Sequence, residues 1–199
     1  IMVYPFTDSQ ILGISTFPYS LKDFFLEGTQ QVSASWITLE NLSFPYCISI
    51  NSSYIYEQST DERINQNDAA ITLAHELGHY LGLRHVFSEG GTTSMCTDTD
   101  YCKDTPSYNR SEYEQWLNNL DKQNKYQLKD LAKRYSCEKG EYEAHNIMDY
   151  AYCFYNEITL EQRKRIRHIL NYSPLIPGPK ESRIDTRGVQ DRLNLPICI

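Results

Sequence analysis

The chain has 199 residues, 40% of them hydrophobic and 13% aromatic, so it can bury the core of one domain or of one domain in two lobes. Its formal net charge of -7 provides no broad basic surface, and we therefore expect neither nucleic acid nor anionic lipid as a partner. The apolar runs are too short to cross a membrane, so no transmembrane segment is expected.

Short segments typical of β-strands come first in the chain. They are rich in β-branched and aromatic residues, are broken by Pro, Gly, Ser and Asn, and cover residues 1–6, 10–17, 33–39 and 45–57. A helix follows, for which Asn67 or Asp68 can provide the N-cap. Its apolar residues recur at helical spacing and predict one apolar face: Ala70, Leu73, Ala74, Leu77 and Leu81. Beyond it the sequence is typical of loops until Thr159, where TLEQ predicts a capping box and a basic helix over 161–170.

The predicted helix carries the sequence HELGHYLGLRH at residues 75–85, with three of the five histidines of the chain. His75 and His79 are four residues apart, so a helix presents both imidazoles to one point. A continuous helix would carry His85 about 9 Å further along the axis, out of reach of that point. Gly82 can adopt a left-handed conformation, end the helix and bring His85 back, so the three histidines are predicted to bind one metal ion.

Three neutral imidazoles with an open fourth position favour a catalytic Zn²⁺ site, because structural zinc sites usually have four protein ligands. Glu76 points away from the ligands, which suits it to hold a water on the metal and to take its proton as the water attacks a carbonyl carbon. The alternative is a helix with ordinary surface histidines, which five specified residues within eleven positions disfavour.

Six cysteines allow three disulfides or a metal site. Zinc ribbons need C-x2-C pairs, and the spacing of Cys96 and Cys102 is too wide for one. Disulfides, and with them an oxidising compartment, are the better interpretation. Fifteen pairings remain formally possible for six cysteines.

The motif resembles the metzincin signature H-E-x-x-H-x-x-G-x-x-H, and NIMDY at 146–150 resembles the Met-turn that follows it in these proteases. The resemblance implies that Met148 lies beneath the zinc site and that Tyr150 stabilises the tetrahedral intermediate. Asp149 is expected to anchor the site from behind, whereas His145 and His168 are expected to be ordinary polar positions.

The resemblance narrows to the pappalysin branch, especially bacterial secreted or lipoprotein zinc proteases. It rests on HVFSEGG, on CTDTDYCKDTP at 96–106, and on the cysteine and ITLEQR that follow NIMDY, and it covers about residues 45–172. It implies an α+β fold with one two-lobed catalytic domain. Residues 1–85 would form an upper lobe with a mixed twisted sheet and the zinc helix. Residues 86–199 would form an irregular, disulfide-linked lower lobe with the Met-turn and a C-terminal helix.

In this branch the substrate lies between the lobes and pairs with an edge strand, for which PYCISIN at 45–51 is the candidate. We expect the first strand and the backing helix of the family to lie upstream of Ile1, the alternative being a compact variant without them. The resemblance also implies a calcium ion at Asp100 and Thr105, in a loop that brings Asp98, Asp100 and Asp104 together. A solvated loop is the alternative. The implied disulfides are Cys96–Cys137, Cys102–Cys153 and Cys47–Cys198.

The expected function is zinc-dependent endopeptidase activity on extracytoplasmic proteins or peptides, in a secreted or cell-surface lipoprotein enzyme. A zinc amidase or narrow peptide-processing enzyme is one alternative, and a catalytically silent, zinc-stabilised binding domain is another. The intact Glu76 disfavours the last, because a structural zinc needs no general base. Some relatives cut before arginine. Here the segment after the Met-turn carries basic residues at 163–167 with only Glu157 and Glu161 nearby, so no strict arginine preference is expected. The oligomeric state is left open.

Overall fold

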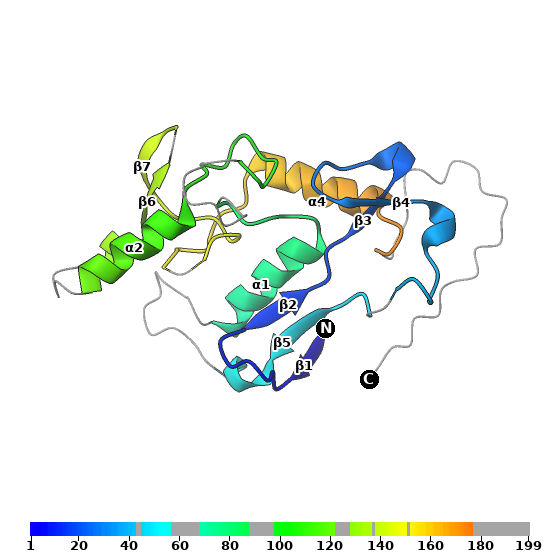
Figure 1. The fold of residues 1–199 in the computed structure, drawn as a ribbon, viewed down its shortest axis with the longest axis horizontal. Coiled ribbons are helices and arrows are strands. Elements are labelled where there is room, and N and C mark those ends of the chain that lie inside the picture. Colours follow the sequence, from blue (N-terminus) through cyan, green and yellow to red (C-terminus); the bar gives the residue numbers. More distant parts are fainter. Residues whose placement is uncertain are drawn as a thin grey trace.

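The computed structural model describes residues 1–42, 45–56, 68–87, 98–121, 128–136, 138–150 and 152–176. The fold combines helices and strands, with β1 to β5 preceding the first α-helix (Figure 1). The strands are β1 (Met2–Tyr4), β2 (Gly13–Ser15), β3 (Tyr19–Leu21), β4 (Gln30–Val32), β5 (Ile48–Asn51), β6 (Lys133–Ser136) and β7 (Gly140–Glu143). The helices are α1 (Ala69–Tyr80), α2 (Arg110–Asp121), α3 (Leu128–Leu131) and α4 (Leu160–Tyr172), with short 3-10 turns η1 (Lys22–Phe24), η2 (Ala34–Trp36) and η3 (Ser52–Tyr54). Within these ranges, no helix has the length and apolar character that a membrane span requires.

The upper sheet has the strand order β1-β5-β2. Strand β5 pairs in parallel with β1 and antiparallel with β2, where Gly13 lies opposite Ile50. The expectation that residues 45–51 form the free edge is therefore wrong, because β5 is hydrogen-bonded on both sides and all four of its residues are buried. The edge beside α1 is β2 (Figure 1).

Helix α1 begins at the N-cap Asp68, whose side chain accepts a hydrogen bond from the Ala70 backbone N–H at 2.7 Å. Its most buried positions are Thr72, His75, Glu76 and Gly78, whereas Ala70 and Leu77 on the predicted apolar face are exposed. The predicted apolar face is thus only partly buried, because β2 covers the polar side of the helix. Gly13 allows that approach: a Cβ atom there would lie 2.7 Å from Glu76 Cγ.

Helix α1 ends in a Schellman motif. Leu83 N–H donates to the Gly78 carbonyl at 2.9 Å and Gly82 N–H donates to the His79 carbonyl at 2.9 Å. Gly82 has φ +87°, in the left-handed region that favours glycine. The chain therefore reverses within two residues, as the position of His85 requires.

Helix α4 lies beside the β3–β4 pair (Figure 1). It begins with the capping box predicted from TLEQ, formed by Thr159 and Gln162. Phe24 stacks on Tyr172 with ring centroids 4.5 Å apart, and the Ser173 hydroxyl donates to the Tyr19 carbonyl. Residues 19–32 are thus bound to the C-terminal helix, across the boundary expected at residue 85.

Several elements differ from the sequence-based expectation. Residues 33–39 form no strand but contain the 3-10 turn η2, and the region expected to be loops contains α2, α3 and the β6–β7 hairpin. Helix α2 and the residues after α1 enclose the main apolar core, which consists of Leu83, Val86, Phe87, Tyr108, Tyr113 and Met148. This core adjoins the histidine cluster, because Val86 and Phe87 follow His85 in the chain and the Phe87 ring stacks on the His85 ring.

Candidate active site

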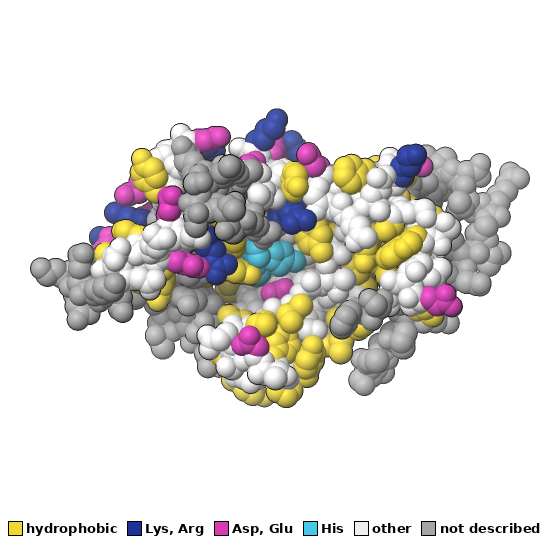
Figure 2. Space-filling view, viewed as in Figure 1, with side chains coloured by type: hydrophobic (Ala, Val, Ile, Leu, Met, Phe, Trp, Pro, Cys, Tyr) yellow, Lys and Arg dark blue, Asp and Glu magenta, His cyan; other side chains and the backbone are white. Residues whose placement is uncertain are grey.

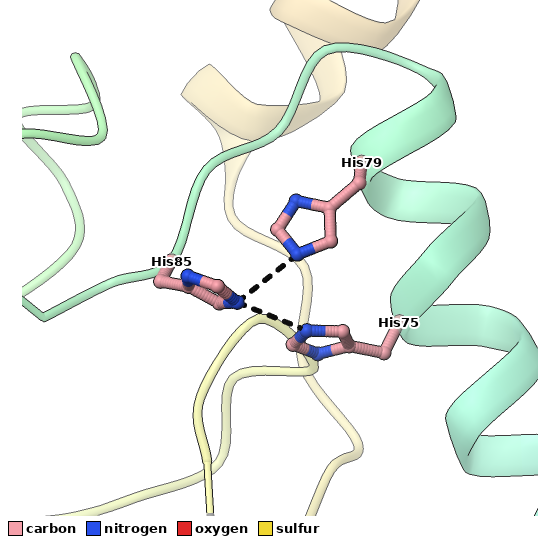
Figure 3. Close-up of side chains that lie close together, drawn as sticks. All are labelled: His75, His79 and His85. Atoms are coloured by element: carbon pink, nitrogen blue, oxygen red, sulfur yellow. Dashed lines mark hydrogen bonds between the residues drawn. The ribbon is translucent and has the colours of Figure 1, made fainter. Parts of the chain in front are cut away.

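Histidine side chains occupy the middle of one face of the molecule, with acidic and basic side chains close by (Figure 2). His75 and His79 extend from α1, and His85 approaches them from the segment after the Schellman motif (Figure 3). The Nε2 atom of His85 lies 3.3 Å from that of His75 and 3.0 Å from that of His79. The histidine motif thus converges on one point, as expected.

The second nitrogen of two of these rings is held by backbone. His75 Nδ1 lies 2.7 Å from the Ile147 carbonyl oxygen and His79 Nδ1 lies 2.8 Å from the Leu83 carbonyl oxygen. Since a carbonyl only accepts, each ring donates from Nδ1 and keeps a lone pair on Nε2. Burial, together with the neighbouring His79 and His85, lowers the pKa of His75 to about 3, so its imidazole is neutral.

The three nitrogens fit zinc. Zn–N bonds of about 2.0–2.1 Å in a tetrahedron place ligand nitrogens roughly 3.3 Å apart, close to the two separations found here. Within the part of the chain that the structure describes, this is the only group of three or more His, Cys, Asp or Glu residues able to hold a metal ion. Three ligands leave a fourth position open, which is typical of a catalytic site.

A cleft of about 590 Å³ lies beside the histidine cluster and is lined by His75 and Glu76. One wall is the Gln10–Gly13 segment entering β2, another is the side of α1 that carries Thr72 and Glu76, and the remaining wall includes Tyr150 and Arg110. Glu76 is 8% exposed, and burial raises the pKa of its carboxyl group to about 7. A buried carboxyl with this pKa, beside the metal ligands, is suited to exchange a proton near neutral pH.

The segment at 146–150 passes beneath the cluster. Met148 is completely buried and packs against Gly78, where the lack of a side chain allows the contact. Its carbonyl accepts a hydrogen bond from Val86 N–H at 3.3 Å, and its own N–H donates to Asn146 Oδ1 at 3.0 Å. Tyr150 follows, with its ring centroid 4.3 Å from that of His85 and 5.4 Å from that of His75.

Asp149 lies behind this turn and is almost completely buried. It accepts hydrogen bonds from the Tyr108 hydroxyl at 2.5 Å and the Tyr150 N–H at 2.7 Å. Arg134, which sequence reasoning missed, faces it and donates to the Tyr150 and Tyr152 carbonyls at 3.0 and 3.1 Å. The anchor expected of Asp149 therefore acts on the turn that carries Tyr150.

The acidic loop brings Asp100 and Thr105 together, but their polar atoms bond to each other and to the loop. Thr105 Oγ1 lies 2.7 Å from Asp100 Oδ2, and Cys102 N–H donates to Asp100 Oδ1 at 2.8 Å. Asp104 instead accepts from the Glu161 N–H at 2.9 Å. A calcium ion at this loop stays a prediction.

The predicted Cys102–Cys153 disulfide is absent, because both residues are free, buried thiols in different surroundings. Cys102 Sγ lies 3.6 Å from the Asp100 carbonyl oxygen, and Cys153 Sγ lies 3.3 Å from the Asn146 carbonyl oxygen. Cys47 is also a free thiol, and because its predicted partner Cys198 lies outside the described residues, that pair stays a prediction. Cys96, Cys137 and Cys198 lie outside the described residues.

The remaining polar candidates lie away from the cluster. His168 Nε2 is 2.9 Å from the Phe24 carbonyl oxygen, and His145 Nδ1 is 3.0 Å from Asn156 Oδ1. Arg165 donates to the Gly82 and Glu27 carbonyls, and Glu161 accepts from the Lys103 N–H at 2.6 Å. The basic residues of α4 do not line the cleft, which instead contains Arg110 of α2.

Comparison with known proteins gives three similarities. Residues 36–171 match the Peptidase M43 family, described as pregnancy-associated plasma protein-A. The extracellular metalloproteases of Arthroderma benhamiae and Trichophyton verrucosum are each 37% identical over 108 residues, which is 53% of this chain and 32% of theirs. The chain thus spans about a third of the length of these relatives. Mature mirolysin of Tannerella forsythia, solved in complex with a cleaved peptide, aligns with a TM-score of 0.47 and 21% identity over 85% of this chain and 50% of that one.

Proposed function

The chain belongs to the Peptidase M43 family of metzincin-type zinc metalloproteases, and from this membership we propose that it hydrolyses internal peptide bonds with a zinc ion held by His75, His79 and His85. The observation that carries the proposal is the convergence of three histidine Nε2 atoms next to the buried carboxyl of Glu76, which lines an open cleft. A structural zinc site would need neither the open position nor the acid.

When bound, zinc would polarise a water molecule and the substrate carbonyl. Glu76 accepts the proton of the attacking water and passes it to the leaving amine. Its burial beneath β2 supports this role, because a carboxyl with a pKa of about 7 can both accept and return a proton near neutral pH. Gly13 keeps the space that the carboxyl occupies free of side-chain atoms.

The Tyr150 hydroxyl donates to the carbonyl oxygen as negative charge develops on it. Support comes from the ring position, which is against His85 and half open to the cleft. Arg134 and Asp149 form hydrogen bonds with the backbone of Tyr150 and thereby fix the position of its side chain. Preorganisation of this kind is what makes a hydrogen-bond donor effective in a transition state.

We propose that the substrate runs along β2. This strand has a free edge in the described part of the sheet, and its N-terminal approach lines the cleft beside Glu76. An extended peptide could add to that edge by backbone hydrogen bonds. Substrates outside the cytoplasm, and a secreted or surface-attached enzyme, are proposed from the extracellular metalloproteases that the chain resembles.

The test is a zinc analysis combined with a protease assay on wild type and Glu76→Ala, using casein and a mixed peptide library. We expect about one zinc per chain in both proteins and turnover only in the wild type. Glu157→Ala is a matched control, because Glu157 is exposed and does not line the cleft. Zinc binding with equal inactivity of both proteins on all substrates would contradict the proposal and favour a silent binding domain. Cleavage of one amide or one peptide only would favour the amidase or narrow processing enzyme.

A further inference from the structure

We propose that Arg110 is a specificity-determining residue that binds a carboxylate of the substrate, so that this cleft selects acidic peptides. This inference rests on the proposed function, since it names the substrate class of the same cleft. The carboxylate can come from an acidic side chain or from the C-terminus of a short peptide. The chemistry is the same in both cases, and the experiment below separates the two sources.

The position of Arg110 carries the first step. It is the first residue of α2 and lines the same cleft as His75 and Glu76. Its guanidinium carbon lies 4.7 Å from the centroid of the Tyr150 ring and 5.1 Å from that of Phe87. Since Tyr150 packs directly on His85, the guanidinium is one aromatic ring away from the metal ligands. A substrate side chain next to the scissile bond can extend past this ring to the guanidinium.

The hydrogen bonds of Arg110 leave it able to bind a ligand. Its Nε donates to Glu114 Oε1 at 2.7 Å. No hydrogen bond is found for Nη1 or Nη2 within the described part of the chain, and the side chain is 42% exposed. These two nitrogens form the planar fork that pairs with both oxygens of a carboxylate. Stacking on two rings holds the fork in place, so less side-chain freedom is lost on binding.

The location of Arg110 on its helix is not explained by helix stability. A positive charge at a helix N-terminus opposes the helix dipole, and acidic residues are favoured there. An exposed pair with Glu114, four residues away, contributes only about 0.3–0.5 kcal/mol. A ligand carboxylate in the cleft would complete the charge pairing that the helix itself does not supply.

The other charged groups of the cleft do not provide a competing site for a basic side chain. Asp149 is buried behind Tyr150 and faces Arg134. Glu76 is enclosed by β2 and is assigned to the reaction. Arginine or lysine next to the scissile bond would be repelled by the positive charge of Arg110. The expected lack of a strict arginine preference would then be caused by Arg110 and not by the basic residues of α4.

The test uses zinc-loaded protein and quenched peptides that differ only in carrying Glu, Gln or Lys at one of the three positions on either side of the scissile bond. We expect a Glu:Gln ratio of kcat/KM of about five to ten at one position. Arg110→Gln should bring that ratio to about one, and Arg110→Glu should reverse it in favour of a Lys peptide. Glu114→Gln, which keeps the acceptor oxygen for Nε, is the matched control and should retain the wild-type ratio. A wild-type ratio within twofold of one at every position, or an unchanged ratio in Arg110→Gln, would overturn the proposal.

Two further arms complete the design. Peptides with a free or amidated C-terminus show whether the bound carboxylate is a chain end, since only then does amidation lower kcat/KM. Fluorescence anisotropy measures the Kd of the same peptides for zinc-loaded Glu76→Gln, and this measurement does not depend on turnover. If the wild type cuts no peptide, the proposed function fails. Carboxylate binding would still be supported in that case if the Glu and Gln peptides have different Kd values and Arg110→Gln abolishes the difference. Equal Kd values for both peptides in that case reject it.

Discussion

Arg134 and Asp149 form a buried ion pair behind Tyr150, with Nε and Oδ2 3.4 Å apart and both side chains almost fully enclosed. Because removal of one partner leaves an uncompensated buried charge, Arg134→Gln should lower the free energy of unfolding by about 3–5 kcal/mol. Urea unfolding measures this. Lys133→Gln is the control: its pairs with Asp130 and Glu141 are exposed, and the expected loss is below about 1 kcal/mol. Equal losses in the two variants would refute a stabilising role for the buried pair.

Tyr150→Phe should lower kcat about 10- to 100-fold and leave the zinc content intact, because it removes one donor to the developing charge on the carbonyl oxygen. The measurement is steady-state kinetics on a peptide cut by the wild type, with metal analysis of both proteins. Tyr135→Phe, at a tyrosine that is 76% exposed and outside the cleft, should not change kcat. Unchanged turnover in Tyr150→Phe would remove the assigned role.

Gly82→Ala should destabilise the protein more than Gly140→Ala, although both glycines have left-handed backbone, with φ +87° and +79°. At either position the strain of alanine costs about 1–2 kcal/mol. At Gly82 the new methyl would also lie 2.8 Å from Ile169 Cγ1, whereas at Gly140 it meets nothing within 4 Å. Thermal unfolding of the zinc-loaded proteins compares them. We also expect Gly82→Ala to weaken zinc binding, because His85 follows the turn. Equal changes of melting temperature and of zinc affinity in Gly82→Ala and Gly140→Ala would contradict this role of Gly82.

Cys102 and Cys153 should behave as buried free thiols. Burial raises the pKa of each to about 12, so at pH 8 both are protonated and iodoacetamide reacts slowly with the folded protein. After denaturation without reductant, both should be alkylated, and peptide mass spectrometry identifies the modified residues. Failure to alkylate either one until a reductant is added would restore the disulfide expected from the family resemblance.

A calcium ion at Asp100 and Thr105 predicts that EDTA-treated protein, reconstituted with zinc alone, melts below protein given zinc and calcium. Asp100→Asn should remove that difference, because it deletes a charged ligand. Glu138→Gln, at an acidic residue on another loop, is the control and should keep it. Full recovery of activity and melting temperature with zinc alone would show that no calcium acts at this loop.

The metal centre was predictable because the three histidines that form it lie within eleven consecutive residues. Helical spacing places His75 above His79, and Gly82 supplies the left-handed residue that reverses the chain. The central position of β5 in its sheet was not predictable in the same way. Residues 45–51 have strand-like composition, but whether a strand is central or at an edge depends on partners distant in sequence, here Met2–Tyr4 and Gly13–Ser15.

Helix α2 had a signal that the interpretation as loops overlooked, since Tyr113, Trp116, Leu117 and Leu120 recur at helical spacing. Arg110 and Arg134 had none. Each reaches the site from a segment well outside the histidine motif, and nothing in the adjacent sequence distinguishes them from solvent-exposed arginines. Their roles follow only from the packing of aromatic rings around the guanidinium groups.

The contacts that cross residue 85 have a consequence for how the protein could be divided. His75 depends on the carbonyl of Ile147, and α4 is bound to the segment around Phe24 and Tyr19. A single cut between His85 and Val86 would therefore leave two fragments, each of which exposes the surface that packs against the other. Neither fragment should fold alone, but mixing them should restore a zinc-binding complex, so the site could serve as its own reporter of fragment complementation.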